Sequence, residues 1–115
     1  MLKIKKSTEH KEINGYCPMA AASKIIGDIW TLLIIRDLLK GAKRFNELLE
    51  SLKGISSSTL VQRLKLLESE NILTRVSFPE IPPRVEYSLT QKGTDLHLIV
   101  EAIKSYGEKY ESKSL

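Results

Sequence analysis

Hydrophobic positions recur at helical spacing in the first part of the chain, and glycines mark the breaks. Pro18 suits the first position of a helix because its missing N–H would have no partner there, and Gly27 ends that helix. Asp28 is a suitable cap for a second helix, 29–40, which is apolar around most of its girth. A helix with so narrow a polar side is surrounded by protein, so we expect it to be the central core helix. Its polar side consists of Arg36, Asp37 and Lys40.

Two further segments keep the same hydrophobic spacing and are joined by a short turn. The first, 45–52, ends at Lys53-Gly54, where glycine can take the left-handed conformation that closes a helix. The second, 57–69, follows Ser56, a favourable N-cap, and its leucines recur on one face. We therefore expect a helix–turn–helix pair whose second helix is buried along its leucines.

An alternating pattern follows and predicts a hairpin over 72–89. Strands 72–78 and 84–89 flank a proline-rich tip, 79–83, and each strand alternates apolar and polar positions. We expect each strand to have one buried and one polar face. The expected buried positions are Thr74, Val76 and Phe78 on the first strand, and Val85, Tyr87 and Leu89 on the second.

Helical spacing returns at the end of the chain. Thr90 is the expected cap of one last helix that reaches about Tyr110. Its apolar stripe lies beyond the hairpin and is either a lid on the core or a contact between subunits. We interpret 90–111 as a dimerisation helix. The stripe consists of Leu96, Ile99, Val100, Ile103, Tyr106 and Tyr110.

The order of these elements predicts a fold class. Helix, turn, helix and hairpin form a winged helix-turn-helix, in which the second helix enters a DNA major groove and the hairpin lies beside it over the backbone. We therefore expect a mainly α fold with a small β-hairpin, extended by extra N- and C-terminal dimerisation helices. At this length the chain is one domain, 1–115.

Charge weakly favours an anionic partner. The chain has 18 basic and 14 acidic side chains, a net charge of +4. Four of the lysines fall in the first eleven residues. We expect residues 1–15 to form a flexible basic arm, either a solvated tail or a contact to phosphate.

Residue types disfavour several other classes of protein. A single cysteine excludes an intrachain disulfide and favours a reducing cytoplasm. The longest apolar run, 30–35, is far too short to span a bilayer, so no membrane partner is expected. His10 and His97 lie in no nucleophile, general-base or zinc pattern, and no glycine-rich loop is present to hold a phosphate. We expect neither an enzyme nor a protein with a metal or cofactor.

Polar positions of helix 56–69 are the candidates for reading DNA. Arginine can donate two bonds to guanine, glutamine can pair with adenine, and hydroxyl groups reach phosphates or several bases. The helix N-terminus adds N–H groups that favour phosphate. An ordinary solvated helix face is the alternative. The candidates are Ser57, Ser58, Thr59, Gln62 and Arg63.

Three more cations are candidates for contacts with the DNA backbone. Lys43 and Arg44 precede the first helix of the pair, a place that commonly lies against phosphates; a solvated loop is the alternative. Arg84, at the base of the wing, could reach a minor groove or a phosphate. It could instead form a salt bridge with Glu86 or another nearby acid.

Several sequence blocks together form a family pattern. The blocks are Cys17-Pro18, Gly27-x-x-Trp30 running into 32–38, 43–48, 54–56 leading into 59–64, and 79–90 with Lys92-Gly93. On these blocks, from about Tyr16 to Tyr110, the chain resembles HxlR-type bacterial and archaeal transcriptional regulators. The last block is long and specific.

The resemblance implies a homodimer that binds a pseudo-palindromic operator in double-stranded DNA. It also implies a role for Cys17, because the matching cysteine is a thiol switch in some members. Cys17 stands at the start of a helix, where the helix dipole and free N–H groups stabilise a negatively charged thiolate. The alternative is that Cys17 is an inert residue that packs under the start of the helix. Two departures stand out: Asp28-Ile29 replaces a frequent Gly-Lys pair, and Ser57-Ser58 replaces a frequent basic or proline residue.

We therefore expect a homodimeric transcriptional regulator that reads DNA through helix 56–69, with 72–89 as its wing. A winged-helix module that binds a protein is the main alternative, and it would present an exposed apolar patch over the same surface. A small-molecule sensor is a third hypothesis, although no polar cluster in the sequence points to a ligand class.

Overall fold

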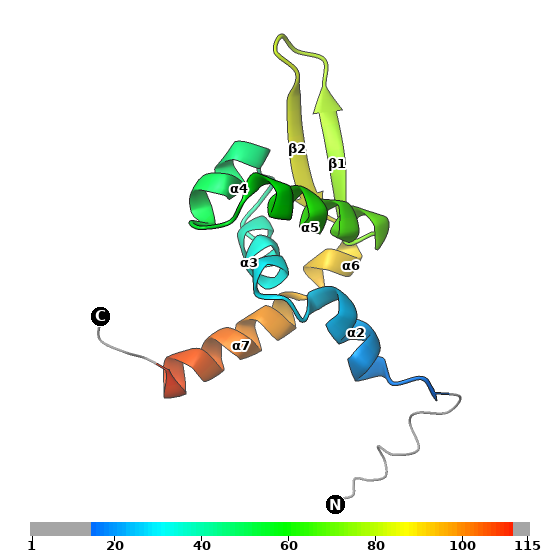
Figure 1. Ribbon diagram of the computed structural model, residues 1–115, viewed down its shortest axis with the longest axis vertical. Coiled ribbons are helices and arrows are strands. Elements are labelled where there is room, and N and C mark those ends of the chain that lie inside the picture. Colours follow the sequence, from blue (N-terminus) through cyan, green and yellow to red (C-terminus); the bar gives the residue numbers. More distant parts are fainter. Residues whose placement is uncertain (1–14, 112–115) are drawn as a thin grey trace, which may run out of the picture.

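The computed structural model describes residues 15–111 and shows a winged helix-turn-helix. Figure 1 shows the hairpin extending from one end of the molecule, while the first and last helices diverge at the opposite end. The predicted basic arm lies outside the described residues except for Gly15. The elements are α2 (Pro18–Ile26), α3 (Ile29–Leu38), α4 (Phe45–Ser51), α5 (Ser57–Ser69), β1 (Leu73–Phe78), β2 (Arg84–Leu89), α6 (Gln91–Thr94) and α7 (His97–Tyr110).

The core forms around α3, as predicted for the central helix. Ile34 and Ile35 are completely buried, and the leucines of α5 pack against the same cluster. Burying one such side chain contributes roughly 1.5–3 kcal/mol, so this cluster dominates the stability of the domain. The buried leucines of α4 and α5 are Leu48, Leu60, Leu64 and Leu67.

The expected polar side of α3 needs correction. The helix ends at Leu38, two residues earlier than predicted, and Asp37 is 2% exposed rather than solvated. The Nε and NH2 groups of Arg36 donate to Oδ1 of Asp37 at 3.0 and 2.8 Å. The carboxylate can be buried because its neighbour compensates its charge.

The three predicted side-chain caps are present. Asp28 accepts from the backbone N–H of Thr31 at 3.0 Å, and Ser56 accepts from that of Thr59 at 3.1 Å. Thr90 accepts from the backbone N–H of Gly93 at 3.1 Å. Each cap satisfies an N–H group that has no partner inside its helix.

The wing has a different buried face from the one predicted. It begins at Leu73, and antiparallel pairing sets Leu73 opposite Leu89 and Arg75 opposite Tyr87. Directly opposed residues point to the same face of a sheet, so Arg75, not Val76, shares the face of Tyr87. In β1 only Leu73 is buried and residues 74–77 are exposed, so the predicted alternation of a buried and a polar face is wrong for this strand. Thr74 and Val76 are therefore exposed, and Phe78 is only half-buried.

The predicted single C-terminal helix is two helices. Thr90 caps the short α6, and a tight turn at Asp95 and Leu96 separates it from α7. The N–H of Leu96 donates to the carbonyl of Gly93, only three residues earlier, at 3.0 Å. Such tightening redirects the chain, so α7 leaves the domain at an angle to α6.

Across residues 15–111 no single helix is long and apolar enough to cross a bilayer. The pair α2 and α3 reaches that length and composition together, but the two helices are bent by 78°.

Candidate nucleic-acid interface

The outer face of α5 is polar and open to solvent. Ser58 and Gln62 lie opposite the buried leucines and are exposed, as predicted. Ser57 is exposed at the start of the helix. These three side chains can donate and accept hydrogen bonds, so this face has the chemistry needed to read base edges in a major groove.

Hydroxyl groups cluster at the N-terminus of α5. Oγ of Ser56 donates to Oγ1 of Thr59 at 2.9 Å and lies 3.3 Å from Oγ of Ser58. Thr59 is half-buried and turned toward the flank of the helix. The predicted candidate Thr59 therefore has its hydroxyl engaged within the protein, unlike Ser57.

Arg63 also lies on the flank of α5, where it meets the first turn of α3. Its Nε donates to Oδ2 of Asp28 at 2.8 Å, and its NH2 donates to Oδ1 at 3.3 Å. The Arg63 guanidinium, with the N–H of Thr31, lowers the pKa of Asp28 to about 2. The same pairing raises the pKa of Arg63. In the free protein this arginine is thus held by a carboxylate.

Lys43 and Arg44 lie between the core and the wing. The backbone of Lys43 forms an isolated β-bridge with Tyr87, with N–O distances of 3.0 and 2.8 Å. Arg44 is exposed, and its N–H donates to Oε1 of Glu47 at 2.7 Å. The bridge ties this segment to β2, so both cations are held next to the helix-turn-helix and the wing.

Arg84 forms salt bridges inside the wing, which was the predicted alternative to a contact with DNA. Its NH2 lies 2.9 Å from Oε2 of Glu80, and its NH1 lies 3.5 Å from Oε2 of Glu86. Its guanidinium also stacks over the ring of Phe78 at 4.0 Å. These contacts connect both strands and the tip, so Arg84 stiffens the wing in the free protein.

Two cations on this surface are not among the residues that the sequence predicted to contact DNA. Lys65 continues the outer face of α5 after Ser58 and Gln62, and Arg75 projects from β1; both are exposed. They line one shallow hollow together with Glu68. Helical spacing from Ser58 could have identified Lys65, whereas the out-of-phase strand hid Arg75.

Cys17 stands at the N-cap of α2, as predicted. It is half-buried, and its side chain makes no capping hydrogen bond. Among residues 15–111, no group of three or more His, Cys, Asp or Glu side chains is placed to hold a metal ion.

The predicted C-terminal stripe divides into two parts. Leu96 and Val100 pack against the core, whereas the rest of the stripe is open to solvent. The exposed fractions of Ile99, Ile103, Tyr106 and Tyr110 are 39%, 51%, 64% and 58%. We call these four residues the α7 stripe. Ile99 borders a hollow beside α2 and Ile103 a groove beside α3, so Tyr106 and Tyr110 are the most open part of the stripe.

Comparison with known proteins gives a consistent family. A family model described as HxlR-like helix-turn-helix matches residues 25–115. YodB, an HTH-type transcriptional regulator of Bacillus subtilis, is 39% identical over 98 residues, which is 84% of this chain and 88% of YodB. An HTH-type regulator of Synechocystis is 38% identical over 99 residues, 86% of this chain and 73% of that protein.

Solved structures show the same fold. HypR, described as a redox regulator, in its oxidized form has a TM-score of 0.80 and 33% identity over 86% of this chain and all of that chain. Reduced YodB from B. subtilis has a TM-score of 0.72 and 38% identity over 83% of this chain and 94% of that chain. A regulator of the MarR family from Porphyromonas gingivalis has a TM-score of 0.78 and 36% identity, covering 82% of this chain and 92% of that one.

Proposed function

This chain belongs to the HxlR-like helix-turn-helix family of transcriptional regulators, and from this premise we propose that it is a homodimer that recognises a pseudo-palindromic DNA operator. The observation that carries the proposal is the outer face of α5, where polar side chains stand beside exposed cations. In this proposal residues 1–115 form one domain, with 90–111 as its dimerisation segment.

We assign the reading of bases to side chains of α5. The cations around α5 are assigned to phosphate contacts that position the protein on the DNA. Ser57 and Gln62 are exposed and can reach base edges. Ser58 is also exposed, but its Oγ lies 3.3 Å from Oγ of Ser56, and Thr59 lies at the margin of this set. Cations around α5, all exposed except the half-buried Lys43, fix the register on phosphates. We assign phosphate contacts to Lys43 and Arg44, as the sequence predicted, and add Lys65 and Arg75.

Arg63 and Arg84 stay in the proposed DNA-binding set, but with defined partners in the free protein. Reading a base with Arg63 requires breaking its bond to Asp28, and a phosphate contact by Arg84 requires giving up Glu80. We propose that Arg63 acts mainly by fixing α5 on α3. Arg84 acts mainly by keeping the wing rigid beside the DNA.

The α7 stripe supports the homodimer. Four large apolar side chains, each worth roughly 1.5–3 kcal/mol when buried, are enough to hold two subunits together. A two-fold dimer presents two α5 helices, which fit half-sites about 34–36 Å apart or a multiple of that distance. The alternative of a protein-binding module has less support, because the outer face of α5 is polar.

Cys17 is proposed as a thiol switch. The relatives named above include a regulator solved in oxidized and reduced forms, and YodB has been solved reduced and after diamide treatment. Oxidation of Cys17 to a disulfide between subunits, or to a mixed disulfide, would alter the start of α2. Alkylation rates and DNA affinity before and after mild oxidant, in wild type and Cys17→Ser, test this role. A thiol as slow as a free model thiol, with unchanged DNA binding, would refute it.

Selection of bound DNA from a random pool tests the main proposal. The purified full-length protein should enrich a two-fold symmetric sequence. Lys65→Ala should weaken binding to that sequence and to unrelated DNA alike, whereas Gln62→Ala should relax the preference at particular positions. No enrichment of any sequence would contradict the proposal.

A further inference from the structure

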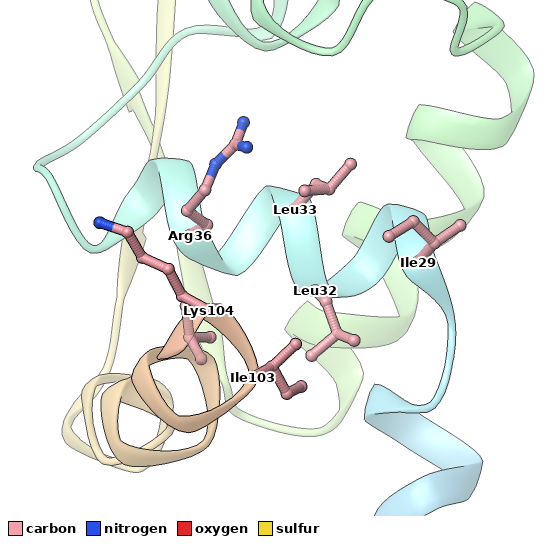
Figure 2. A pocket seen from close by; sticks show the side chains of 7 residues that line it. Ile29, Leu32, Leu33, Arg36, Ile103 and Lys104 are labelled. Atoms are coloured by element: carbon pink, nitrogen blue, oxygen red, sulfur yellow. The ribbon is translucent and has the colours of Figure 1, made fainter. Parts of the chain in front are cut away.

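A groove between α3 and α7 lies apart from the proposed DNA contacts. It encloses about 310 Å³, at the lower end of the range of about 300–1,000 Å³ that is usual for small-molecule sites. Figure 2 shows that its lining side chains come from both helices, with Leu32 of α3 and Ile103 of α7 pointing toward each other. The apolar walls are formed by Ile29, Leu32, Leu33, Val100 and Ile103.

Two cations stand at one end of this groove. Arg36 from α3 and Lys104 from α7 both line it, on the side away from Ile29 (Figure 2). Arg36 already donates two hydrogen bonds to Asp37, so its charge is partly compensated. Lys104 makes no salt bridge with any residue between 15 and 111. Within the part of the chain that the structure describes, the groove therefore combines aliphatic walls with one positive charge that has no salt-bridge partner.

The groove and the α7 stripe lie on different sides of α7. Successive residues of a helix are turned by about 100°, which places Val100 and Lys104 roughly 80–160° away from Ile99, Tyr106 and Tyr110 around the axis. Ile103 borders both surfaces. A second subunit that covers the stripe thus leaves the Lys104 end of the groove open.

We propose that the α3–α7 groove binds a small monocarboxylic acid with a compact apolar body. The aliphatic walls would take the body out of water, and Lys104 with Arg36 would hold the carboxylate. A neutral apolar molecule would offer no negative charge to pair with the ammonium group of Lys104. A polyanion such as a nucleotide would find no polar side chains along the walls.

The position of the groove links this ligand to DNA binding, a link that rests on the proposed function. Ile29 at the far end of the groove directly follows Asp28. Oδ2 of Asp28 is 2.8 Å from Nε of Arg63 on α5. A ligand that displaces the first turn of α3 therefore acts on the contact that fixes the DNA-reading helix, and it serves as an effector.

Benzoate and its uncharged analogue benzamide are suitable probes. Methyl-labelled full-length protein is titrated with each probe without DNA, and spectra report on the Ile, Leu and Val methyl groups. Benzoate should shift the groove methyls of Ile29, Leu32, Leu33 and Val100 in a saturable manner. Benzamide should bind several-fold more weakly, because a partly exposed ion pair contributes up to about 1 kcal/mol, or about five-fold.

Lys104→Gln is the diagnostic variant and Lys109→Gln its matched control on the same helix. Lys104→Gln should remove the preference for benzoate over benzamide, and Lys109→Gln should keep it. Leu33→Trp, checked for folding by its thermal transition, should fill the groove and abolish both interactions. Equal affinity for the two probes, unsaturated shifts at about 10 mM, or shifts confined to the α7 stripe would overturn the site.

A DNA titration separates this proposal from the proposed function. Benzoate should change the operator affinity of wild type, and Lys104→Gln should need about five-fold more benzoate for the same change. Groove binding with no change in operator affinity would refute the effector role alone. Absence of specific DNA binding in both proteins would refute the proposed function and leave the measured groove binding standing.

Discussion

The guanidinium of Arg63 on α5 is bound in bidentate fashion by the carboxylate of Asp28, the residue that caps α3. The Nε–Oδ2 distance is 2.8 Å, and the same Oδ2 accepts from the N–H of Thr31 at 3.0 Å. One carboxylate therefore caps the central helix α3 and anchors α5, the helix that we propose reads DNA.

The first prediction concerns this anchor. Asp28→Ser keeps a side chain able to cap α3 but removes the ion pair, and Arg63→Ala removes the pair from the other side. Each should lower the free energy of unfolding by about 1 kcal/mol, and the double variant should lose less than the sum. Chemical denaturation of the four proteins measures this coupling.

DNA titration of the same variants separates an anchor from a base reader. An anchoring Arg63 predicts that Asp28→Ser and Arg63→Ala weaken operator binding to a similar extent. Tighter binding by Asp28→Ser together with weaker, less selective binding by Arg63→Ala would instead establish Arg63 as a base-reading residue.

The second prediction concerns acid. The pKa of Asp28 is lowered from 3.8 to about 2, chiefly by its hydrogen bond to Arg63. A lowered folded-state pKa gives stability that is fully present above about pH 4 and is lost as the pH falls toward 2. Asp28 is partly exposed, so the contribution is about 1 kcal/mol after solvent screening. The stability difference between wild type and Arg63→Ala should thus be constant near neutral pH and shrink below pH 4.

Carboxyl NMR titration of Asp28 checks this directly. Its pKa should rise in Arg63→Ala and stay low in Lys65→Ala, a matched loss of charge on the same helix. An Asp28 that titrates at its ordinary value in wild type would contradict the ion pair.

The third prediction concerns salt. If each subunit makes three to five phosphate contacts, the logarithm of the DNA affinity should fall against the logarithm of salt concentration with a slope of roughly −5 to −9. Lys43→Ala or Lys65→Ala should each make the slope shallower by about two, because each substitution removes one phosphate contact from both subunits. Lys109→Ala, on α7, should leave the slope unchanged. Fluorescence anisotropy at several salt concentrations measures it, and a flat response would remove α5 and the wing from the interface.

The fourth prediction concerns the subunit contact. Tyr106 is 64% exposed in the single chain and packs beside Tyr110, with ring centroids 4.9 Å apart. Tyr106→Asp should weaken the dimer about ten-fold or more, because it removes apolar contact area and buries a charge. Glu108→Gln, on the opposite side of α7, should not. Sedimentation over a range of concentrations checks both, and a monomeric wild type at micromolar concentration would refute the dimer.

The fifth prediction compares two glycines of the C-terminal segment. A Cβ at Gly93 would collide with the carbonyl of Ile72 and crowd the side chain of Leu89, whereas one at Gly107 would meet nothing. Gly93→Ala should therefore destabilise the protein by about 1–3 kcal/mol or more. Gly107→Ala should stabilise α7 by about 0.5–1 kcal/mol through helix propensity. Thermal unfolding distinguishes them, and equal effects would contradict the close packing of α6 on the wing.

Local chemistry by itself determined where most elements begin and what class of fold they form. Ser56 and Asp28 cap helices because their side-chain oxygens reach backbone N–H groups three residues ahead, a relation that needs no distant contact. The leucine spacing of α5 likewise fixes its buried face. The blocks that resemble HxlR-type regulators depend on the same local patterns, and the family comparison confirmed that resemblance.

Contacts between segments that are distant in the sequence set which polar side chains remain free. Arg63 is polar at a helix surface, yet its partner lies 35 residues away, so no spacing rule could reveal the ion pair. The phase of β1 depended on Leu73 reaching the core and pairing with Leu89, and this pairing exposed Val76. The periodicity of a sequence predicts that side chains alternate between two faces. Contacts between distant segments determine which face is buried and which charged side chains remain available to bind a ligand.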